Sequence, residues 1–548
     1  MDVTKELKEV VKECATKAFN LEDVNVDELV MIETPKDKTH GDYSTNIAMR
    51  LARPLRNSPV NIANTLKTEL EKSDMIEKVE IAGPGFINFF LKNDAITKII
   101  KEIIEQGDDF GRNDSGNHEK IMVEYVSANP TGDLHLGHAR GAAYGDSLTR
   151  VLNFSGYDCL REYYVNDAGN QINVLANSLF NRYKEALGLD FNLDEIGYQG
   201  KDVIKLAKDI AKKEGDKYLN IPFEEAIEHF KNIGIELELN KIKKDLDLYR
   251  VGFDNYTSER SIYAKGKVAE TLEKLRNSGH TYESEGALWL KTTDYGDDKD
   301  RVLVKSDGSY TYLLPDLAYH ADKFDRGYNN LVNLFGADHH GYIIRLKAGL
   351  KILGYPSENL DILIIQIVRL MEDGLEVKMS KRTGNAVTIR ELCEDVGVDV
   401  ARYFFLARPL DSHFDFDLAL ARKNSNENPT YYIQYAYARM CSVLKKDGSF
   451  EVKDAYPLLT NEKEIDLIKV LSEFKKLVID VAKNKEVARL TTYAYKLAQS
   501  FHSLYNDCKF IDEENAELTH ERLSLVKASS IVLKNVLSLL GIEAREKM

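Results

Sequence analysis

The sequence predicts an α/β protein, in which a central domain with a parallel β-sheet is flanked by an N-terminal α/β unit and a C-terminal all-α bundle. Two observations predict the sheet and the bundle. Short apolar runs alternate with helical stretches in the middle of the chain, and a helical apolar period continues from about residue 424 to the end. Strands that alternate with helices are typical of parallel sheets with crossover connections. A chain of 548 residues is also too long for one hydrophobic core, which indicates several domains.

The N-terminal unit is expected over residues 1–112. Val11, Ala15 and Ala18 form one helical stripe, and residues 79–91 alternate as two strands around a Gly-Pro-Gly turn. The polar stretch 107–120 is interpreted as the linker to the next domain.

The central domain is expected over residues 113–424. A helix from about residue 135 to 154 carries Gly137, Gly141 and Gly145, which allow close packing on a sheet. The polar, lysine-rich span 172–285 lacks the strand–helix rhythm, and we interpret it as a mostly helical insertion. The strand candidates are residues 121–126, 158–165, 330–335 and 360–368.

The C-terminal domain is expected over residues 425–548 as a helical bundle, because two long segments each carry an apolar face. The first face consists of Ile465, Ile468, Leu471, Val478 and Val481, on what we expect to be one helix. The second consists of Leu525, Val526, Ile531, Val532, Val536, Leu537 and Leu540.

Composition and charge narrow the function classes. The net charge of −15 argues against a nucleic-acid partner without excluding one, since an acidic protein can still carry a local basic surface. Five scattered cysteines exclude a CxxC zinc site and argue against a disulfide framework. The longest apolar run identified, residues 362–368, is far shorter than the roughly 20 residues needed to cross a bilayer. The charged N-terminus lacks the apolar core of a signal peptide, so we expect a cytoplasmic protein.

The first motif is the string His135-Leu136-Gly137-His138, which follows a predicted strand and opens a predicted helix. A helix N-terminus offers free N–H groups and a positive dipole end to phosphate. Gly137 leaves room for a close approach, and the two imidazoles lie on one helical face. A metal-binding histidine pair is the alternative, although no third ligand lies nearby in the sequence.

The second motif is the basic run Lys378-Met379-Ser380-Lys381-Arg382, which follows a predicted buried strand. A solvated basic loop is the simple interpretation. At the carboxyl end of a parallel strand, however, such a loop is well placed to bind a ligand. Lys381 could then neutralise charge on a leaving pyrophosphate.

Together the segments SANPTGDLHLGH (127–138) and KMSKR (378–382) resemble the paired signatures of class I aminoacyl-tRNA synthetases. The resemblance to the arginyl-tRNA synthetases covers essentially the whole chain, which keeps a KMSK signature that many members lack. The other segments that carry it are VEYVSANP (123–130), HGDYSTNIAM (40–49), NPTYYIQYAYAR (428–439), YLLPD (312–316) and GADHH (336–340).

The resemblance implies a Rossmann-like catalytic domain and a set of site residues. The implied catalytic residues are His135 and His138 at the phosphates and Lys378 and Lys381 at the pyrophosphate. The implied ATP site consists of Ala128, Asn129, Pro130, Thr131, Gly132, His135, Gly137, His138, Asp338, Lys378, Ser380 and Lys381. The implied arginine site consists of Glu124, Asn129, His138, Tyr312, Asp316 and His339, with Tyr312 and Asp316 at the guanidinium. The implied tRNA contacts are Asp42, Tyr43, Asn46, Tyr431, Tyr435 and Arg439.

Three of these segments also have simpler interpretations. A carboxylate is the best partner for a guanidinium, but Asp316 could instead be the N-cap of the helix that follows it. Asp338, His339 and His340 could form a metal cluster rather than lie beside ribose and adenylate. The tyrosines of 431–437 could be helix core or could stack on unpaired bases, and we expect both.

The resemblance implies that the carboxylate of arginine attacks the α-phosphate of Mg²⁺-ATP, and that the arginyl group then passes to the 2′-hydroxyl of the terminal adenosine of tRNA-Arg. It also implies a monomer, and we expect no zinc, no prosthetic group and no membrane partner. Two alternatives remain: a nucleotidylyltransferase with no tRNA substrate, and a catalytically inactive tRNA-binding protein. The extra terminal domains argue against the first, and the intact motif residues His135, His138 and Lys381 argue against the second.

Overall fold

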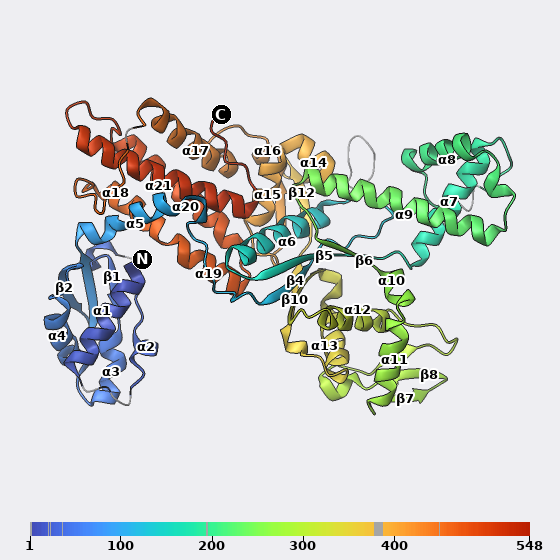
Figure 1. Cartoon of the computed structure of the whole chain (residues 1–548), viewed down its shortest axis with the longest axis horizontal. Helices are drawn as coiled ribbons and strands as arrows, with labels where there is room; N and C mark the ends of the chain where they lie inside the picture. The colour runs from blue at the N-terminus through green and yellow to red at the C-terminus, as the bar shows by residue number, and fades with distance from the viewer. Residues whose placement is uncertain are drawn as a thin grey trace.

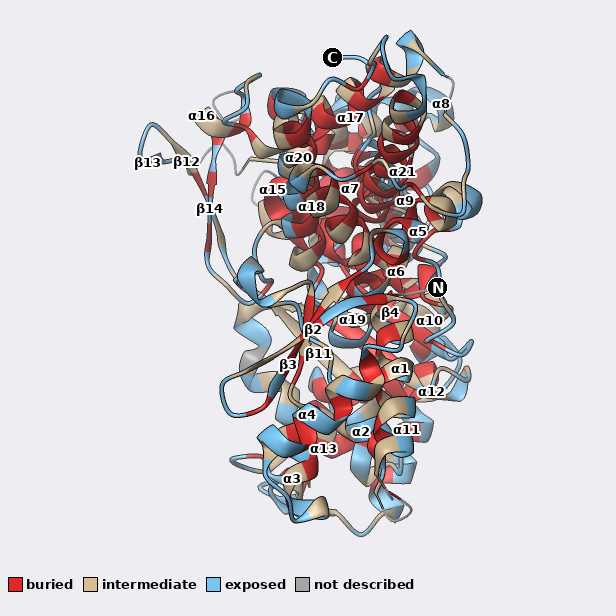
Figure 2. Cartoon of the chain, turned by 90° about the vertical axis from the view of Figure 1, so that its left-hand side faces the viewer, coloured by how far each residue is buried: buried red, intermediate tan, exposed pale blue. Residues whose placement is uncertain are grey.

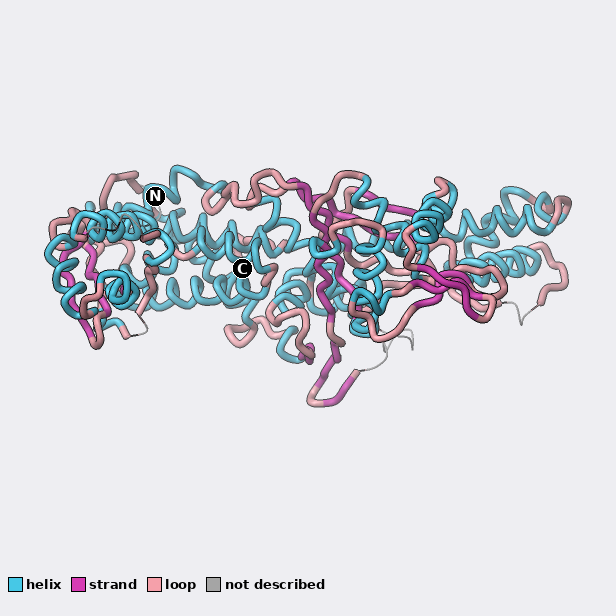
Figure 3. The backbone as a smooth tube through the Cα atoms, turned by 90° about the horizontal axis from the view of Figure 1, so that it is seen from below, coloured by secondary structure: helices cyan, strands magenta, loops and turns pink. Residues whose placement is uncertain are grey.

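The computed structural model describes residues 3–19, 21, 24–35, 37–192, 196–377, 387–448 and 450–548, except for the side chains of residues 38 and 340. The molecule is elongated, and Figures 1 and 3 show the N-terminal unit and a helical projection at opposite ends of its long axis. A parallel sheet lies between them, and the helical bundle lies between this sheet and the N-terminal unit.

The N-terminal unit is a three-stranded antiparallel sheet, in the order β1-β3-β2, with helices packed on it. The two predicted strands around the Gly-Pro-Gly turn are confirmed, since Ala82 pairs with Phe86 across that turn. The elements are α1 (Val3–Ala18), α2 (Val26–Leu29), η1 (Lys38–His40), β1 (Tyr43–Thr45), α3 (Ile47–Leu55), α4 (Pro59–Leu70), β2 (Ile76–Ala82) and β3 (Phe86–Leu91).

The central sheet has the strand order β11-β10-β4-β5-β6, and every neighbouring pair is parallel. This confirms the predicted α/β fold with a parallel sheet. The last predicted strand is in fact two, because β11 ends at Ile365 and a separate strand begins at Val368. The sheet strands are β4 (Lys120–Glu124), β5 (Asp158–Val165), β6 (Asn255–Ser258), β10 (Asn330–Gly336) and β11 (Leu360–Ile365).

Helix α6 (Leu136–Phe154) connects β4 to β5 and packs directly on the sheet, because glycines remove side chains at the contact. A Cβ atom on Gly145 would lie 2.2 Å from the ring of Tyr125, and one on Gly141 would lie 2.8 Å from Ile365. The predicted close packing of this helix is therefore confirmed, and it fixes the direction in which the first turn of α6 points.

The predicted helical insertion is shorter than expected. Helices α7 (Asn170–Ala186), α8 (Lys201–Glu214) and α9 (Phe223–Leu248) form the projection, but the chain then returns to the main sheet as β6. After β6, a small antiparallel sheet packs with further helices at the lower right of Figure 1. Its elements are α10 (Glu259–Ala264), α11 (Lys267–Asn277), β7 (Thr281–Ser284), β8 (Ala287–Leu290) and β9 (Arg301–Val304).

The remaining elements of the central part are helices around the sheet and a second small sheet formed by β12, β13 and β14. Strands β12 and β13 project from the body as an antiparallel pair, as Figure 2 shows, and β12 also pairs in parallel with β14. The elements are α12 (Leu313–Asp325), η6 (Ala337–Tyr342), α13 (Ile343–Ile352), β12 (Val368–Glu372), β13 (Leu375–Glu376), α14 (Ile389–Val396), α15 (Val398–Leu406) and β14 (Phe414–Asp417).

The C-terminal part is a helical bundle with a buried core, which appears red in Figure 2. The face expected on one helix is divided between α18 and α19, which are separated at Glu473. α21 is long and apolar enough by composition to cross a membrane, which the sequence analysis missed; 83% of its most apolar window is buried, as in the core helix of a bundle. The helices are α16 (Leu418–Ala421), α17 (Pro429–Lys446), α18 (Glu462–Ser472), α19 (Phe474–Asn484), α20 (Ala488–Asp507) and α21 (Ala516–Leu540).

The segment interpreted as a linker is packed against the bundle. Helix α5 (Asn93–Gln106) contacts α18 and α21, and the Asn535 amide donates to the carbonyls of Gly107 and Phe110. Phe110 is fully buried and stacks on Phe474. The N-terminal unit is therefore held to the bundle through its last helix.

Candidate active site

Two cavities open side by side at the carboxyl ends of the central strands, where parallel sheets usually bind ligands. The first has a volume of about 860 Å³ and is lined by Glu124, Asp316 and Tyr312. The second, of about 830 Å³, is lined by His135 and His138. The two cavities share wall residues, which are Val126, Ser127, Asn129, Leu334, Gly336 and His339.

The two motif histidines lie at the N-terminus of α6, with His135 as the N-cap. Their ring centroids are 3.8 Å apart, so the prediction that they share one face is confirmed. His138 Nδ1 accepts from the backbone N–H of His135 (3.2 Å), and His135 Nδ1 accepts from that of Gly137 (3.2 Å). Each ring therefore carries its proton on Nε2, which remains available as a donor.

Both rings are neutral at pH 7. Burial lowers the pKa of His135, and burial together with the neighbouring His135 lowers the pKa of His138 to about 3. The pair can therefore donate two neutral N–H bonds at a helix N-terminus, which suits a phosphate whose charge the helix dipole also favours.

The turn between β4 and α6 is strained. Val126 (φ 68°) and Ser127 (φ 40°) both have left-handed backbones, which is rare for a β-branched residue such as valine. This conformation places the Ser127 hydroxyl to accept from the Tyr164 backbone N–H (3.1 Å) and to donate to Glu124 Oε1 (3.0 Å). Such strain is often found at binding sites, where the surrounding structure holds it in place.

The loop from Ala128 to Gly132 covers the start of α6. Ala128 and Asn129 line the second cavity, whereas Pro130 is buried. Asn129 and Thr131 both donate to the Gln171 side-chain carbonyl, at 3.1 and 3.2 Å. Gln171, the second residue of α7, was not predicted to belong to the site.

The second motif, including Lys378, Ser380 and Lys381, lies outside the described residues. The described residues on either side of it, Val377 and Val387, both line the second cavity. Thr388 then pairs with His135 as an isolated β-bridge, and the Ile389 N–H donates to the Leu134 carbonyl (2.8 Å). The end of this segment is thus attached directly to the first motif.

Asp316 lies inside α12 and not at its cap, so the N-cap interpretation was wrong. The N-cap is Tyr312, and the carboxylate of Asp316 accepts instead from His320 Nδ1 (3.0 Å) and the Tyr342 hydroxyl. Burial opposes ionisation, but His320, Tyr342 and Lys323 outweigh it and hold the pKa of Asp316 below its ordinary value. Tyr312, 87% exposed, stands at the mouth of the cavity.

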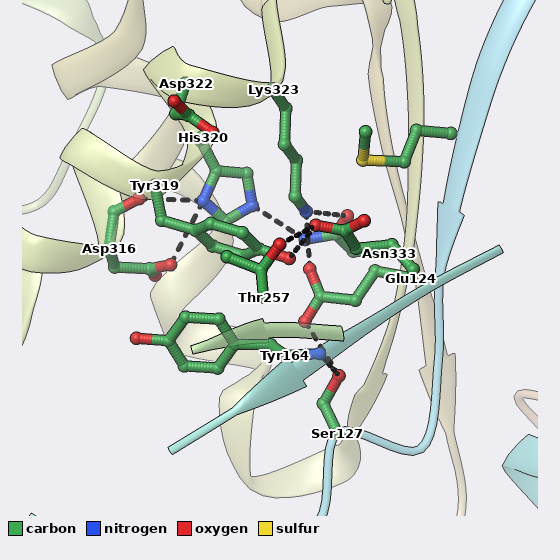
Figure 4. Close-up of polar contacts among 12 residues, drawn as sticks. Glu124, Ser127, Tyr164, Thr257, Asp316, Tyr319, His320, Asp322, Lys323 and Asn333 are labelled. Carbon is green, nitrogen blue, oxygen red and sulfur yellow. Dashed lines mark hydrogen bonds and ion pairs between the residues drawn. The ribbon is translucent and has the colours of Figure 1, made fainter. Parts of the chain in front are cut away.

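Glu124 forms the opposite wall of the first cavity, at the end of β4. Its carboxylate is buried and forms an ion pair with Lys323, a lysine that the sequence analysis did not select (Figure 4). Glu259 adds a third carboxylate to the lining, and burial raises its pKa despite a hydrogen bond from Tyr164. The first cavity is therefore rich in carboxylates, as a pocket for a cationic side chain must be.

Two arginines also line this cavity. Arg301 is held by Asp297 (2.7 Å), while Arg345 lies 5.5 Å from the Tyr342 ring centroid. The Arg345 Nε is buried without a hydrogen-bond partner in the described part of the chain.

The segment from Gly336 to His340 borders both cavities through His339. Asp338 and His339 are largely exposed and lie 3.5 Å apart, and Asp338 lines the second cavity. Among the described residues there is no group of three or more His, Cys, Asp or Glu that could hold a metal ion.

The N-terminal residues expected at tRNA are half-buried or buried in this structure. Asp42 forms an ion pair with Lys469 of α18 (2.6 Å) and accepts from the Leu91 N–H (2.7 Å). Tyr43 is buried, and the Asn46 side-chain oxygen is buried without a partner in the described part of the chain.

The aromatic residues of α17 divide into a buried and a half-exposed set. Tyr437 is buried, whereas Tyr431 and Tyr435 stack at 5.9 Å on the helix surface. Arg439 continues this row, with its guanidinium 4.4 Å from the Tyr435 ring centroid and 4.5 Å from that of Tyr505. We call Tyr431, Tyr435, Arg439 and Tyr505 the aromatic row.

Comparison with known families accounts for nearly the whole chain. Residues 3–91 match the arginyl tRNA synthetase N terminal domain, residues 99–403 the catalytic domain of class I (R) tRNA synthetases, and residues 433–548 the DALR anticodon binding domain.

Individual relatives give the same result. The arginine–tRNA ligase of Bacillus subtilis is 51% identical, and arginine–tRNA ligase 1 of Halalkalibacterium halodurans is 50% identical, each with 100% of both chains covered. A Campylobacter jejuni structure described as an arginyl tRNA synthetase is 36% identical over 84% of this chain and 100% of its own, with a TM-score of 0.76. The arginyl-tRNA synthetase of Thermus thermophilus shares the fold over 100% of both chains, with a TM-score of 0.76 at 22% identity.

Proposed function

Because the chain belongs to the arginyl-tRNA synthetase family and charges tRNA-Arg with arginine, we propose that its two cavities hold the two small substrates. Arginine occupies the carboxylate-rich cavity and ATP the cavity at the N-terminus of α6. The observation that carries this assignment is the wall that the cavities share at Ser127, Asn129 and His339. Two substrates on either side of that wall can bring their reacting atoms together.

The first step joins the two substrates. A carboxylate oxygen of arginine attacks the α-phosphorus of Mg²⁺-ATP, the bond to the bridging oxygen breaks, and pyrophosphate leaves with the electron pair. The product is arginyl-adenylate. The 2′-hydroxyl of the terminal adenosine of tRNA then attacks the arginyl carbonyl, and AMP leaves. The protein contributes positioning and charge stabilisation to both steps.

At the phosphates, His135 and His138 donate through Nε2–H, and the N-terminal dipole of α6 assists them. Lys378 and Lys381, from the segment whose two ends border this cavity, neutralise the leaving pyrophosphate. Ala128, Asn129, Pro130, Thr131, Gly132, Gly137, Asp338 and Ser380 complete the ATP site.

At the other substrate, Asp316 receives the guanidinium and Tyr312 covers it from the mouth of the cavity. Glu124 and Asn129 hold the α-ammonium end, and His339 and His138 lie towards the adenylate. The lowered pKa of Asp316 supports this role, because the carboxyl is ionised when the cationic substrate arrives.

Binding of tRNA is assigned to the two terminal domains, with 1–112, 113–424 and 425–548 as the domain bounds. The polar stretch before β4 and the continuous helices after α16 support this division. The aromatic row offers stacking faces beside a cation, which suits unpaired bases. Asp42, Tyr43 and Asn46 add contacts from the N-terminal domain. We propose a cytoplasmic monomer with no membrane partner.

The experiment that tests this function is arginine-dependent exchange of pyrophosphate with ATP, with and without tRNA-Arg, followed by charging of that tRNA. Exchange and charging that require arginine support the proposal. Exchange with a different acid and no charging would indicate a nucleotidylyltransferase, and tRNA binding without exchange would indicate an inactive binding protein.

A further inference from the structure

A buried lysine lies behind the cavity assigned to arginine. Lys323 of α12 is 0% exposed, and its ammonium forms an ion pair with Glu124, donates to Asn333 Oδ1 (3.1 Å) and lies 4.4 Å from the Tyr319 ring centroid (Figure 4). Taking an ammonium group out of water is costly unless it is fully paired. A leucine or methionine would fill the same space without that cost, so packing alone does not explain a lysine here.

The contacts of Lys323 fix the orientation of its neighbour. A lysine ammonium can only donate, so the Asn333 atom that faces it must be the carbonyl oxygen. The Asn333 amide nitrogen then faces His320 and donates to Nε2 (2.7 Å).

This orientation in turn fixes the proton on the imidazole. Because His320 Nε2 accepts from Asn333, the neutral ring must carry its proton on Nδ1. That nitrogen lies 3.0 Å from the carboxylate of Asp316 and 2.9 Å from its backbone carbonyl, so His320 donates to Asp316. Lys323 therefore determines, through Asn333 and His320, whether the His320 nitrogen that faces the candidate guanidinium ligand carries a proton.

The same lysine gives the carboxylates on the two walls of the cavity different partners. Glu124 is paired directly with the Lys323 ammonium, whereas Asp316 accepts from His320 Nδ1 and from the Tyr342 hydroxyl. Of these two carboxylates, Asp316 thus has no ion pair with a lysine or arginine among the described residues.

We propose that Lys323 is a positioning residue for arginine, which reserves Asp316 for the guanidinium by fixing Asn333 and His320 and by pairing with Glu124. This inference rests on the proposed function of the cavity. It assigns to Lys323 no contact with substrate, because its side chain lies wholly behind the lining.

Lys323→Met tests whether Lys323 strengthens or weakens the binding of arginine. Without the lysine, Asn333 is free to turn and the lone pair of His320 Nδ1 can face Asp316. The KM for arginine should rise at least about tenfold, since removing one partner of a buried charge pair is costly. The KM for ATP should change less than about threefold, and inhibition by citrulline, which lacks the charge, should weaken less than arginine binding. If Lys323 only repelled the cationic substrate, its removal would lower the KM for arginine instead.

Asn333→Asp is the second variant, and it keeps the Lys323 contact if Lys323→Met fails to fold. An aspartate cannot donate to His320 Nε2, so the ring must protonate there and become a cation beside Asp316. The KM for arginine should again rise more than that for ATP. ¹⁵N labelling of histidine, with His320→Gln to identify the signals, should show an Nδ1–H ring in the parent enzyme and a doubly protonated ring in Asn333→Asp.

Lys267→Met is the matched control, because Lys267 pairs with Asp325, the last residue of α12 (2.9 Å), and does not line the cavity. It should leave the KM for arginine unchanged. An unchanged or lowered KM for arginine in both test variants, or equal weakening of arginine, citrulline and ATP, would overturn the inference. Asp316→Asn distinguishes failure of the inference about Lys323 from failure of the proposed function. If Asp316→Asn raises the KM for arginine and Lys323→Met does not, only the inference about Lys323 fails.

Discussion

At the scale of single residues, the N-terminus of α6 shows how local hydrogen bonds prepare the proposed phosphate site. His135 and His138 cap the helix through Nδ1, and burial keeps both rings neutral. Each ring then has one N–H left, on the nitrogen that makes no capping bond. The donors are in place before a phosphate arrives, so little reorganisation is needed during the reaction.

His138→Asn should therefore lower kcat of arginine-dependent pyrophosphate exchange by about 100- to 1,000-fold, with the KM for ATP changed less than about threefold. The ratio of mutant to parent kcat should stay constant between about pH 6 and 8, because the pKa of His138 near 3 keeps it neutral throughout. His118→Asn, at an exposed histidine outside the cavities, is the control. A kcat for His138→Asn within threefold of the parent would remove His138 from the phosphate site.

Candidate site residues could be predicted from the sequence only where they occur in contiguous motifs. Glu124, His135 and Asp316 belong to such strings and line the cavities, whereas Lys323 is separated from its partner Glu124 by most of the catalytic domain. A signal for it did exist, since Lys323 follows the candidate residue Asp316 by seven positions and therefore shares its helical face. Without coordinates, that partner could not be identified.

At the scale of elements, α6 depends on the absence of side chains where it meets the sheet. Gly145→Ala would place a methyl group 2.2 Å from the Tyr125 ring, which the rigid aromatic cannot avoid by rotation of a flexible end. Such overpacking lowers the free energy of unfolding by about 1–3 kcal/mol, whereas the higher helix propensity of alanine raises it by up to about 1 kcal/mol. Thermal unfolding should show a lower Tm.

Gly234→Ala is the comparison for this prediction. Its nearest atom would be a flexible methyl group of Leu179 at 3.0 Å, so the Tm should change little. A Tm for Gly145→Ala equal to or above that of the parent would show that the backbone of α6 can move away from the sheet.

Strand β6 and the break between α18 and α19 were not predicted from the sequence, each for its own physical reason. Strand β6, Asn255–Ser258, is short and polar and follows a long lysine-rich segment, so it carries no apolar alternation. The break between α18 and α19 at Glu473 was missed because the apolar period continues across it. Long periodic helices such as α21, by contrast, were predicted correctly from their buried faces.

At the scale of the whole molecule, the bundle and the N-terminal unit form one side of an elongated particle (Figures 1 and 3). Several ion pairs join them, including Asp42–Lys469 (2.6 Å) and Asp108–Lys534 (2.9 Å). Single surface ion pairs contribute little stability, so the buried contacts of α5 must supply most of the stability of the contact between the N-terminal unit and the bundle. A long tRNA could contact both terminal domains while its end reaches the cavities.

Tyr435→Ala tests the aromatic row as a tRNA contact. Loss of one stacking face costs about 1–3 kcal/mol, so the KM for tRNA-Arg should rise about tenfold while the KM for arginine stays unchanged. Tyr435→Phe keeps the ring and should behave like the parent enzyme. Equal tRNA affinities of the alanine and phenylalanine variants, compared at one salt concentration, would show that the row does not stack on bases.

The proposed binding of the arginine guanidinium in the cavity around Asp316 is best tested with Asp316→Asn. The amide oxygen can still accept from His320, so the variant removes the charge and keeps the contact. Asp322→Asn, on the same helix but paired with Arg326, is the control. Steady-state kinetics should show a KM for arginine raised well over tenfold, corresponding to about 2–5 kcal/mol, a nearly unchanged KM for ATP, and citrulline gaining relative to arginine. A KM for arginine equal to that of the parent enzyme would contradict the claim.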